Sequence, residues 1–552
     1  MSSIRAKNLS FHYDNPYVPV FNQLDLTLDT RWRIGLLGRN GRGKTTLLKL
    51  LSGALSPVAG QLSVPIPIVS FPAEPDNPHR PTRQIISDAV APFAAWQAQL
   101  DTLLSDPAPD AIDRYGELLY TYEAHGGYDF DARLSKECAL IGLSASVLDR
   151  DFATLSGGEQ TRALIIALFL KPDAFPLIDE PTNHLDLAGR ERLAQYLTQK
   201  SGFLLVSHDR SFLTGCVDHI VSINRSDVRV HRCGLIDWQR QMQQEEEHER
   251  RRSTNLKLQV RAMERAAKKR RSWSDSREGQ KHEKNPKKRE RISNDTGYIG
   301  RRAALQMKRA LNIERRMTAA LAEKTSLLRN VEKTRKLQLV TRDDAPDQVV
   351  MLEDVTVQPG EATLFAPLTL TVRRGERIAI VGENGCGKTS LLRLILGELP
   401  PATGVIYQPG HVSTSVSRQI PRWRTGLLRG HLQRHGIDET RFRTLMGSFG
   451  VRGELFERPL ETFSMGQRKK VDLCRSFLDP AHMLLWDEPL NYVDMFSREQ
   501  IESVIMQNHP TMVFIEHDRA FIERVATRVV HLQRSDQGAG TLPVMVPMTG
   551  GA

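Results

Sequence analysis

The stretch GRNGRGKTT at residues 38–46 recurs as GENGCGKTS at residues 382–390. Each copy follows a short apolar run, RIGLLG (33–38) or RIAIVG (377–382), and leads into a leucine-rich segment. A G-x-x-x-x-G-K-[ST] loop between a strand and a helix is typical of phosphate binding. Its glycines let backbone N–H groups turn inward, and the helix N-terminus adds partial positive charge. We therefore predict two phosphate-binding loops, one in each half of the chain.

Three further motifs repeat in the same order after each loop. The repeated pairs are LSGGEQTRA (155–163) and FSMGQRKKV (463–471), LIDEPTNHLD (177–186) and LWDEPLNYVD (485–494), and LLVSHDRSFL (204–213) and VFIEHDRAFI (513–522). From the motif serine to the following aspartate the distance is 23 residues in both halves. Such regular spacing indicates a duplication. The predicted fold class is therefore α/β, with two P-loop nucleotide-binding domains.

The two loops contain most of the predicted phosphate-binding residues. These are Gly38, Asn40, Gly41, Gly43, Lys44, Thr45 and Thr46 in the first loop, and Gly382, Asn384, Gly385, Gly387, Lys388, Thr389 and Ser390 in the second. We expect the two lysines to reach the β- and γ-phosphates. The hydroxyls of Thr45 and Thr389 suit Mg²⁺, which prefers oxygen ligands.

An acidic pair ends a later apolar run in each half. Asp179 and Asp487 suit a magnesium contact, and the adjacent Glu180 and Glu488 suit polarising or deprotonating an attacking water. Phosphoryl transfer needs placed charges more than covalent help.

One histidine follows the next apolar run in each half, at His208 and His517. A lone histidine there would more often be structural. Its order and spacing relative to the other motifs favour contact with the γ-phosphate.

These motifs together resemble those of ATP-binding cassette (ABC) proteins. The resemblance implies that two cassettes enclose two ATP molecules, each between the loop of one cassette and the signature of the other. The first-cassette loop, with Asp179, Glu180 and His208, would share a site with Ser464, Gly466 and Gln467. The second-cassette loop, with Asp487, Glu488 and His517, would share one with Ser156, Gly157 and Gly158.

The narrower resemblance is to the ABC-F subfamily, which has two cassettes in one chain and a long charged linker. The run FSMGQRKKV…LLWDEPLNYVD is similar to the Lsa/Vga branch, whose members protect bacterial ribosomes against antibiotics. This resemblance implies an ATP-hydrolysing monomer in the cytoplasm. Its linker would enter the tRNA exit site of the 70S ribosome, touch 23S rRNA and P-site tRNA, and act near the peptidyl-transferase centre.

Several positions depart from the usual cassette pattern. Met465 replaces the first signature glycine, and its side chain restricts close approach to phosphate. Ala73 stands where a glutamine is expected, whereas Gln419 fills that place in the second cassette. Tyr13 is predicted to stack on adenine, but the matching position in the second cassette is Pro359. With both Glu180 and Glu488 present, we predict hydrolysis at both sites, at rates that can differ.

The motifs divide the chain of 552 residues into four parts. We predict a first cassette at 1–235, a helical-hairpin linker at 236–337, a second cassette at 338–535, and a disordered tail at 536–552. The loop lysine and the signature serine lie 112 residues apart in the first cassette and 76 in the second. The extra residues predict a helical insertion at about 85–130, which is either an arm of the kind that the ABC-F resemblance implies or an elaborated helical subdomain.

The linker holds the basic excess of the chain. Residues 251–316 contain 22 Lys and Arg against 7 Asp and Glu, a net charge of +15, whereas the whole chain carries +11. A charge run is usually a solvated helix face. An excess of three to one fits neutralisation of RNA phosphates better. HEKNPKKRER (282–291) would be the tip, where Trp273 and Tyr298 would either stack on bases or pin the turn.

Two rival functions remain open. One is an ABC-F translation factor for stalled ribosomes with no drug role. The other is the ATPase subunit of a membrane exporter, although the longest apolar run, ALIIALFL (163–170), is far short of the roughly 18 residues that a membrane crossing needs. The five scattered cysteines predict small buried residues and no disulfide framework.

Overall fold

The computed structural model describes two compact units, Met1–Leu235 with Arg335–Ala552, and Ile236–Thr334. The described residues are 2–14, 17–105, 108–183, 185–224, 227–279, 337, 339–342, 344–360, 363–451, 453–533 and 545–547, with single residues between 301 and 318.

The first cassette is built on a six-stranded sheet in the order β5-β6-β7-β3-β8-β9. Its strands are β5 (Ile68–Phe71), β6 (Phe175–Asp179), β7 (Phe203–Val206), β3 (Arg33–Gly38), β8 (His219–Ile223) and β9 (Val228–His231). All pair in parallel except β9, which is antiparallel to β8. The central strands read as apolar runs because both faces of a parallel sheet are covered.

The second cassette repeats this sheet in the order β14-β15-β16-β12-β17-β18. Its strands are β14 (Thr414–Ser417), β15 (Met483–Asp487), β16 (Met512–Ile515), β12 (Arg377–Val381), β17 (Arg528–His531) and β18 (Met545–Pro547). Strands β15 and β16 are fully buried. The predicted α/β class and the duplication are therefore confirmed.

A three-stranded antiparallel sheet accompanies each main sheet. The first contains β1 (Ser3–Asp14), β2 (Tyr17–Asp29) and β4 (Ala59–Ser63), and the second β10 (Gln348–Thr356), β11 (Leu368–Arg373) and β13 (Thr403–Tyr407). In each cassette one hydrophobic core joins this sheet to the main sheet and to the helix after the loop. These helices are α1 (Lys44–Leu51) and α12 (Lys388–Ile395).

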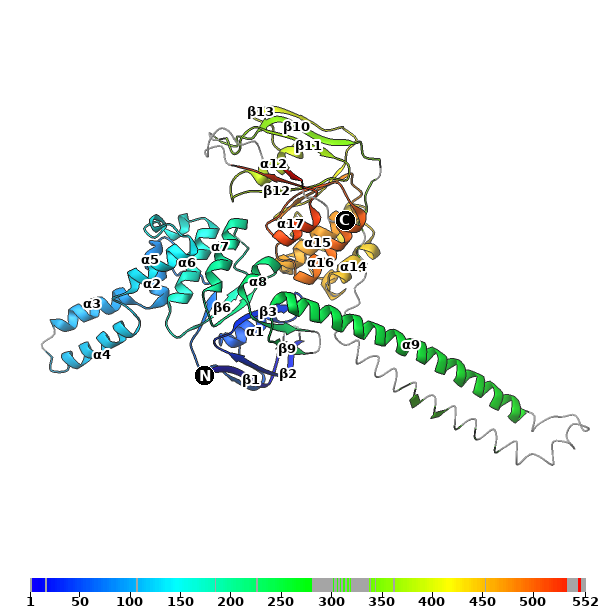
Figure 1. Cartoon of the computed structure of the whole chain (residues 1–552), viewed down its shortest axis with the longest axis horizontal. Coiled ribbons are helices and arrows are strands. Elements are labelled where there is room, and N and C mark those ends of the chain that lie inside the picture. The colour runs from blue at the N-terminus through cyan, green and yellow to red at the C-terminus, as the bar shows by residue number, and fades with distance from the viewer. Residues whose placement is uncertain are drawn as a thin grey trace, which may run out of the picture. The chain divides into compact units, whose positions relative to one another are not determined.

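The remaining cassette helices follow the duplicated order (Figure 1). In the first cassette they are α6 (Gly157–Leu170), α7 (Leu187–Thr198) and α8 (Arg210–Cys216), and in the second α15 (Met465–Leu478), α16 (Met495–Asn508) and α17 (Arg519–Val525).

Among the described residues, four α-helices and two short 3-10 helices lie between β5 and α6 of the first cassette. The α-helices are α2 (Thr82–Val90), α3 (Phe93–Leu104), α4 (Ala111–Ala124) and α5 (Phe130–Ile141). Helices α3 and α4 pack side by side (Figure 1) within the range predicted as a helical insertion. The second cassette has two α-helices in the corresponding place, α13 (Leu428–Arg434) and α14 (Glu439–Ser448).

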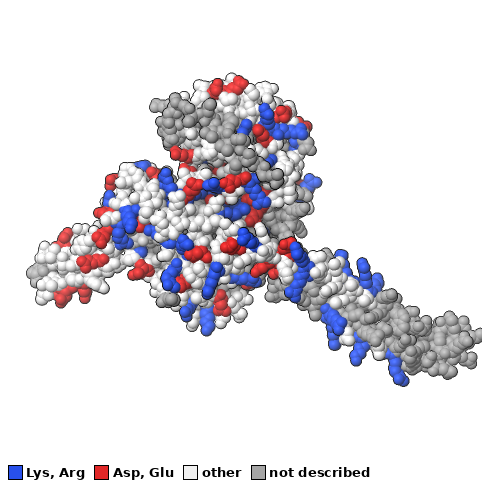
Figure 2. Space-filling model, in the orientation of Figure 1, with Lys and Arg blue, Asp and Glu red and all other residues white. Residues whose placement is uncertain are grey.

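The linker unit begins with α9 (Leu235–Gly279), a helix of 45 residues. An ion pair between Arg251 and Glu247, 2.7 Å long, joins successive turns. Figure 2 shows lysine and arginine side chains along the described part of this helix. The predicted tip at 282–291 and Tyr298 lie outside the described residues, as does the side chain of Trp273.

The prediction of a disordered tail at 536–552 is wrong for three residues. Met545–Pro547 forms β18, antiparallel to β17. The edge strand β17 offers unpaired backbone groups, which an extended apolar segment can satisfy. The rest of the tail lies outside the described residues.

Four of the five cysteines are buried and Cys233 is half-buried, in line with their predicted role. Among the described helices, none combines the length and apolar composition required to span a bilayer.

Candidate nucleotide-binding sites

The first phosphate loop joins β3 to α1. Gly41 and Gly43 have φ angles of 79° and 100°, a left-handed conformation that favours glycine. A Cβ on Gly43 would lie 2.5 Å from the Val20 side chain, so no other residue fits. Lys44 Nζ donates to Gly38 O at 2.7 Å, which holds the ammonium over the loop.

The second loop has the same geometry between β12 and α12. Gly385 and Gly387 have φ angles of 82° and 99°. Lys388 Nζ donates to the carbonyls of Gly382 and Glu383, both at 2.8 Å. Both lysines are buried, as an anion-binding position inside a loop requires.

Around the first loop, the structure brings three predicted side chains together. His208 Nε2 lies 3.5 Å from Glu180 Oε1 and 3.2 Å from Asn40 Oδ1. The backbone N–H of His208 donates to Glu180 Oε2 at 3.4 Å. Glu180 follows β6 with a φ of 50°, and its N–H donates to Val206 O at 2.8 Å. Adjacent parallel strands thus place the carboxylate and the imidazole at one sheet edge.

Around the second loop, Glu488 has more partners than Glu180. Its Oε2 accepts from Gln419 Nε2 at 3.0 Å and from Asn491 Nδ2 at 2.6 Å. His517 Nε2 lies 3.7 Å from its Oε1. No side-chain amide bonds to Glu180 among the described residues, and Ala73 at the position corresponding to Gln419 has none to offer.

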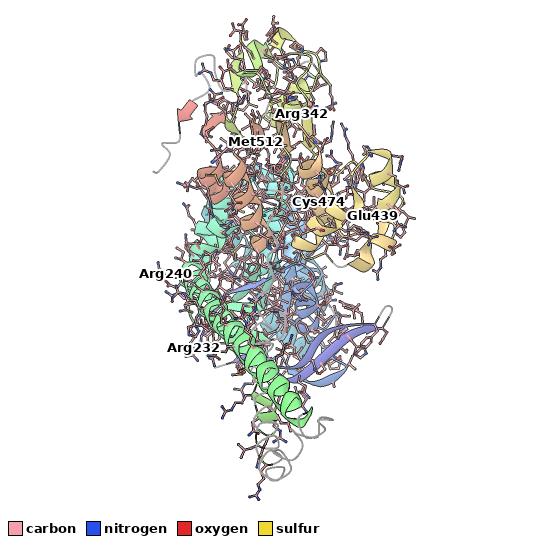
Figure 3. The ribbon with its side chains drawn as sticks, turned by 90° about the vertical axis from the view of Figure 1, so that its right-hand side faces the viewer. Arg232, Arg240, Arg342, Glu439, Cys474 and Met512 are labelled. Atoms are coloured by element: carbon pink, nitrogen blue, oxygen red, sulfur yellow. The ribbon has the colours of Figure 1, made fainter. Side chains whose placement is uncertain are left out.

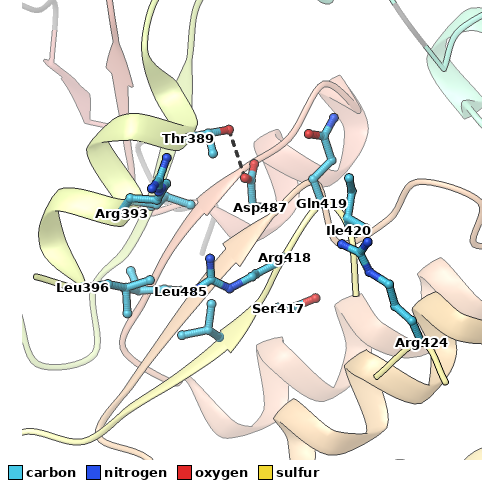
Figure 4. A pocket seen from close by; sticks show the side chains of 12 residues that line it. Thr389, Arg393, Leu396, Ser417, Arg418, Gln419, Ile420, Arg424, Leu485 and Asp487 are labelled. Atoms are coloured by element: carbon cyan, nitrogen blue, oxygen red, sulfur yellow. Dashed lines mark hydrogen bonds between the residues drawn. The ribbon is translucent and has the colours of Figure 1, made fainter. Parts of the chain in front are cut away.

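The predicted magnesium ligands meet only at the second loop. Thr389 Oγ1 donates to Asp487 Oδ2 at 3.0 Å (Figure 4). Thr45 and Asp179 make no such bond in the described structure. A cavity of about 250 Å³ adjoins Thr389, Asp487 and Gln419, and it is also lined by Arg393, Arg418 and Arg424.

The two glutamates have pKa values that are shifted in opposite directions. Burial raises the pKa of Glu180 to about 8, and the charge of Asp179 adds to the shift. Burial would also raise the pKa of Glu488, but His517, Gln419 and Lys388 outweigh it and lower that pKa. Glu488 is therefore held as a carboxylate, whereas Glu180 is held protonated at neutral pH.

Burial also shifts the other site groups. It raises the pKa of Asp179 and of Asp487. Burial lowers the pKa of His517 and, together with the charge of Lys44, holds that of His208 well below its usual range. Both imidazoles are therefore neutral and able to donate one hydrogen bond.

The signature serines begin helices. Ser156 caps α6 and Ser464 caps α15, each in a capping box with Glu159 or Gln467. Met465, the first residue of α15, is 40% exposed.

The structure brings the first phosphate loop against the signature of the second cassette, but no hydrogen bond in the described structure joins the second loop to the first signature. Asn40 Nδ2 donates to Tyr492 O at 2.9 Å, and a Cβ on Gly466 would lie 2.7 Å from that oxygen and 3.2 Å from Asn40 Nδ2. The first loop thus lies directly against the second cassette. The hydrogen bonds of Ser156, Gly157 and Gly158 all stay within the first cassette.

The remaining predicted residues lie at the edges of the loops. The Tyr13 hydroxyl is 3.1 Å from Thr46 Oγ1, and the Tyr13 ring packs edge-on against Phe11. Tyr13 is 39% exposed, so its ring has an open surface. Asn384 is exposed, whereas Ser390 is half-buried.

Three side chains near the sites were not predicted. Asn491 binds Glu488, and its place in D-E-P-x-N was a usable signal. Lys469 donates to Asp487 O at 3.2 Å, and Lys470 to Asp494 Oδ2 at 2.7 Å. Both lysines and both aspartates are buried. In the sequence, the two lysines look like ordinary helix residues.

The buried polar atoms of the sites fit a nucleotide and a cation. Glu180 Oε1, Asp487 Oδ1 and His517 Nε2 are buried without a hydrogen-bond partner in the described structure. Such atoms are rare unless a ligand satisfies them. The described residues contain no group of three or more carboxylates, histidines or cysteines that could hold a metal ion by itself. Mg²⁺ would therefore need phosphate oxygens beside Thr389 and Asp487.

These features define an ATP-binding protein with two cassettes. The family model for ABC transporter matches residues 21–183 and 365–491, more than half of the chain. The chain belongs to this family, as an ABC-F ATP-binding protein whose cassettes hydrolyse ATP.

Two curated relatives align with almost the whole chain. The ribosome protection protein VmlR of Bacillus subtilis is 27% identical over 520 residues, which cover 92% of this chain and 82% of VmlR. The tylosin resistance ATP-binding protein TlrC of Streptomyces fradiae is 28% identical over 551 residues, covering 95% and 97%.

A solved structure shares the fold at lower identity. The archaeal ribosome recycling factor aABCE1, in complex with the ribosomal stalk protein aP1, has a TM-score of 0.57 at 18% identity. The match covers 95% of this chain and 87% of that one.

Proposed function

We propose that this protein is an ATP-dependent ribosome-binding factor that protects the bacterial ribosome from antibiotics. The observation that carries the proposal is the +15 charge of residues 251–316 between two ATP-binding cassettes. The linker of this protein would enter the tRNA exit site of the 70S ribosome and reach toward the peptidyl-transferase centre. There it would contact 23S rRNA and P-site tRNA. The names of VmlR and TlrC support a drug-protecting role.

Each site residue has a proposed role that follows from its chemistry. Lys44 and Lys388 bind phosphates, the loop glycines present backbone N–H groups, and Tyr13 stacks on adenine. Thr389 and Asp487, like Thr45 and Asp179, hold Mg²⁺, which supplies charge neutralisation at the phosphates. Ser464, Gly466 and Gln467, and Ser156, Gly157 and Gly158, complete the opposite sites.

The hydrolytic water would be held by Glu488. Gln419 and Asn491 fix the Oε2 atom of its carboxylate, so the carboxylate is oriented to accept a proton from water. The neutral His517, whose Nε2 atom has no hydrogen-bond partner in the described structure, would donate to the γ-phosphate. Glu180 and His208 occupy the corresponding places at the first loop, where Glu180 would have to lose its proton before it could accept one from water.

Closure of the cassettes would place the linker. Nucleotide binding favours the closed arrangement because each site draws residues from both cassettes. Hydrolysis removes that differential affinity and releases the protein. The cytoplasm, where ribosomes and ATP meet, is the proposed location.

Ribosome co-sedimentation tests the proposal. The Glu180→Gln/Glu488→Gln double variant with ATP should remain bound to ribosomes, because hydrolysis-driven release is blocked. Replacing the lysines and arginines of 282–291 with glutamine, at constant chain length, should abolish binding. Ribosome binding that ignores these replacements would show that the tip is not the RNA contact. Sedimentation with membranes instead of ribosomes would favour the exporter ATPase.

Drug displacement separates protection from a housekeeping role. A labelled antibiotic bound near the peptidyl-transferase centre should leave the ribosome when the protein and ATP are added. Binding without displacement of any such drug would favour a translation factor for stalled ribosomes.

A further inference from the structure

The helical segments of the two cassettes have opposite charge. Residues 418–458 of the second cassette contain nine arginines, no lysine and four acidic residues, a net charge of +5. Residues 85–130 of the first contain one arginine and eight acidic residues, a net charge of −7. Figure 2 shows carboxylates scattered over α3 and α4. Because both segments lie between a sheet strand and a signature helix, the duplicated fold alone does not explain the difference.

Part of the basic charge gathers around one tryptophan. Trp423 is buried, with a relative exposure of 7%. His431 stacks on it at 5.0 Å between ring centroids, and His435 lies at 5.1 Å. Arg434 Nη2 is 3.3 Å from His431 Nδ1, and Arg424 follows Trp423 in the chain. We call Arg424, His431, Arg434 and His435 the Trp423 patch; the two histidine rings contact Trp423, and Arg434 contacts His431.

The two arginines of the Trp423 patch carry uncompensated charge. Arg424 Nε donates to Pro421 O, and Arg434 Nε donates to Gly430 O, each at 3.1 Å. Neither has a carboxylate partner among the described residues, and both are exposed.

Neighbouring arginines in the same segment are neutralised. Arg429 and Arg443 both form ion pairs with Glu439, at 3.1 Å and 2.7 Å. Glu439 is labelled in Figure 3. The segment therefore pairs some of its arginines and leaves those beside Trp423 available.

We propose that the Trp423 patch binds the phosphate backbone of RNA, as a second RNA contact besides the linker. This inference rests on the proposed function. It adds that the helical segment of the second cassette, residues 418–458, contacts RNA. Arginine presents a planar fork that matches phosphate, and the segment uses arginine to the exclusion of lysine. Cations without a carboxylate partner bind a dense polyanion well, because each contact releases counterions.

Salt dependence of binding tests the proposal in the full chain. We would compare the parent with Arg424→Gln/Arg434→Gln on 70S ribosomes and on a free RNA duplex, with ATP, over a range of KCl concentrations. The slope of log K against log salt should fall by about one for each arginine removed. At about 0.1 M salt the affinity should drop at least tenfold on both RNAs.

Arg429→Gln is the matched control in the same segment. Glu439 keeps Arg443, so this variant should leave the salt slope unchanged. Thermal unfolding should be similar for all variants, because the substituted guanidinium groups are exposed.

The outcomes distinguish this inference from the proposed function. Ribosome binding by the parent, with an unchanged slope in the double variant, would overturn the inference and leave the proposed function standing. A weakened complex whose slope is unchanged would also overturn it, since that indicates an acidic protein surface as partner. If the parent bound no ribosomes, the proposed function would fail, and the duplex measurement would decide the inference alone.

Discussion

At the scale of single residues, two glutamates that read alike in the sequence have different surroundings. Glu180 follows a buried strand that ends in the half-buried Asp179, and Glu488 follows one that ends in the buried Asp487. Their φ angles are 50° and 47°. Gln419 and Asn491 hold only Glu488. Without such donors the cost of burial dominates at Glu180, and its pKa rises to about 8.

This difference predicts opposite effects on stability. A carboxyl whose pKa is raised in the fold destabilises the protein progressively as pH rises from its ordinary pKa, about 4.3, to about 8. Without nucleotide, Glu180→Gln should therefore raise the unfolding temperature at pH 8 by at least about 2 °C, and by less at pH 5. Glu488 has a lowered pKa, so its carboxylate stabilises the fold above its ordinary pKa. Glu488→Gln should lower the temperature at pH 8. Calorimetry of both variants at the two pH values would check this, and equal shifts would contradict it.

The same geometry predicts unequal turnover. Glu488→Gln removes a carboxylate that is already oriented by two amides, and should lower kcat for ATP by at least about 100-fold. Glu180→Gln should cost less than about tenfold, because no side-chain amide of the described residues orients that carboxyl and it is held protonated at neutral pH. Steady-state phosphate release by each single variant would measure the two effects. A reversed order would show that the first loop is the main hydrolytic site.

At the scale of elements, the sequence predicted the strands, loops and helices that short-range patterns specify. Loop glycines and apolar runs fall where each motif required them. The contact of Asn40 with Tyr492 could not be predicted, because it joins residues 452 positions apart and depends on how two cassettes pack. The partnership of Lys470 with Asp494 was missed for the same kind of reason. The sequence shows neither burial nor which cation meets which carboxylate.

The loop before α12 gives a test at this scale. Gly387→Ala would put a Cβ 2.9 Å from the Phe365 ring, at a φ of +99°. Strain and overpacking should together cost at least about 2 kcal/mol and weaken ATP binding at the second loop. Gly397→Ala is the matched control, since Gly397 has a φ of +71° and no atom within 4 Å of its added Cβ. Thermal unfolding and nucleotide titration of the two variants separate the clash from the backbone cost.

At the scale of the whole molecule, ion pairs join the two cassettes, and one of them has a buried carboxylate. Glu502 on α16 is fully buried, pairs with Arg210 of the first cassette, and accepts from Arg524 of its own cassette at 2.9 Å. A carboxylate shared by two cations is costly to remove, because both then lose their partner. Arg519 and Glu191, 3.4 Å apart, also join the cassettes, but their side chains are 60% and 53% exposed. Screened pairs of this kind contribute little.

Closure should therefore depend on Glu502 and not on Glu191. Glu502→Gln should raise the ATP concentration for half-maximal closure by about tenfold, which corresponds to about 1.4 kcal/mol, whereas Glu191→Gln should leave it unchanged. Energy transfer between dyes on the two cassettes would follow the closure. Arg210→Gln should reproduce the effect of Glu502→Gln from the other cassette, and the double variant should add almost nothing to either, because both remove one interaction. Additive effects would mean that the two residues act separately, and closure would then have to be driven by the first loop's contact with Tyr492 instead.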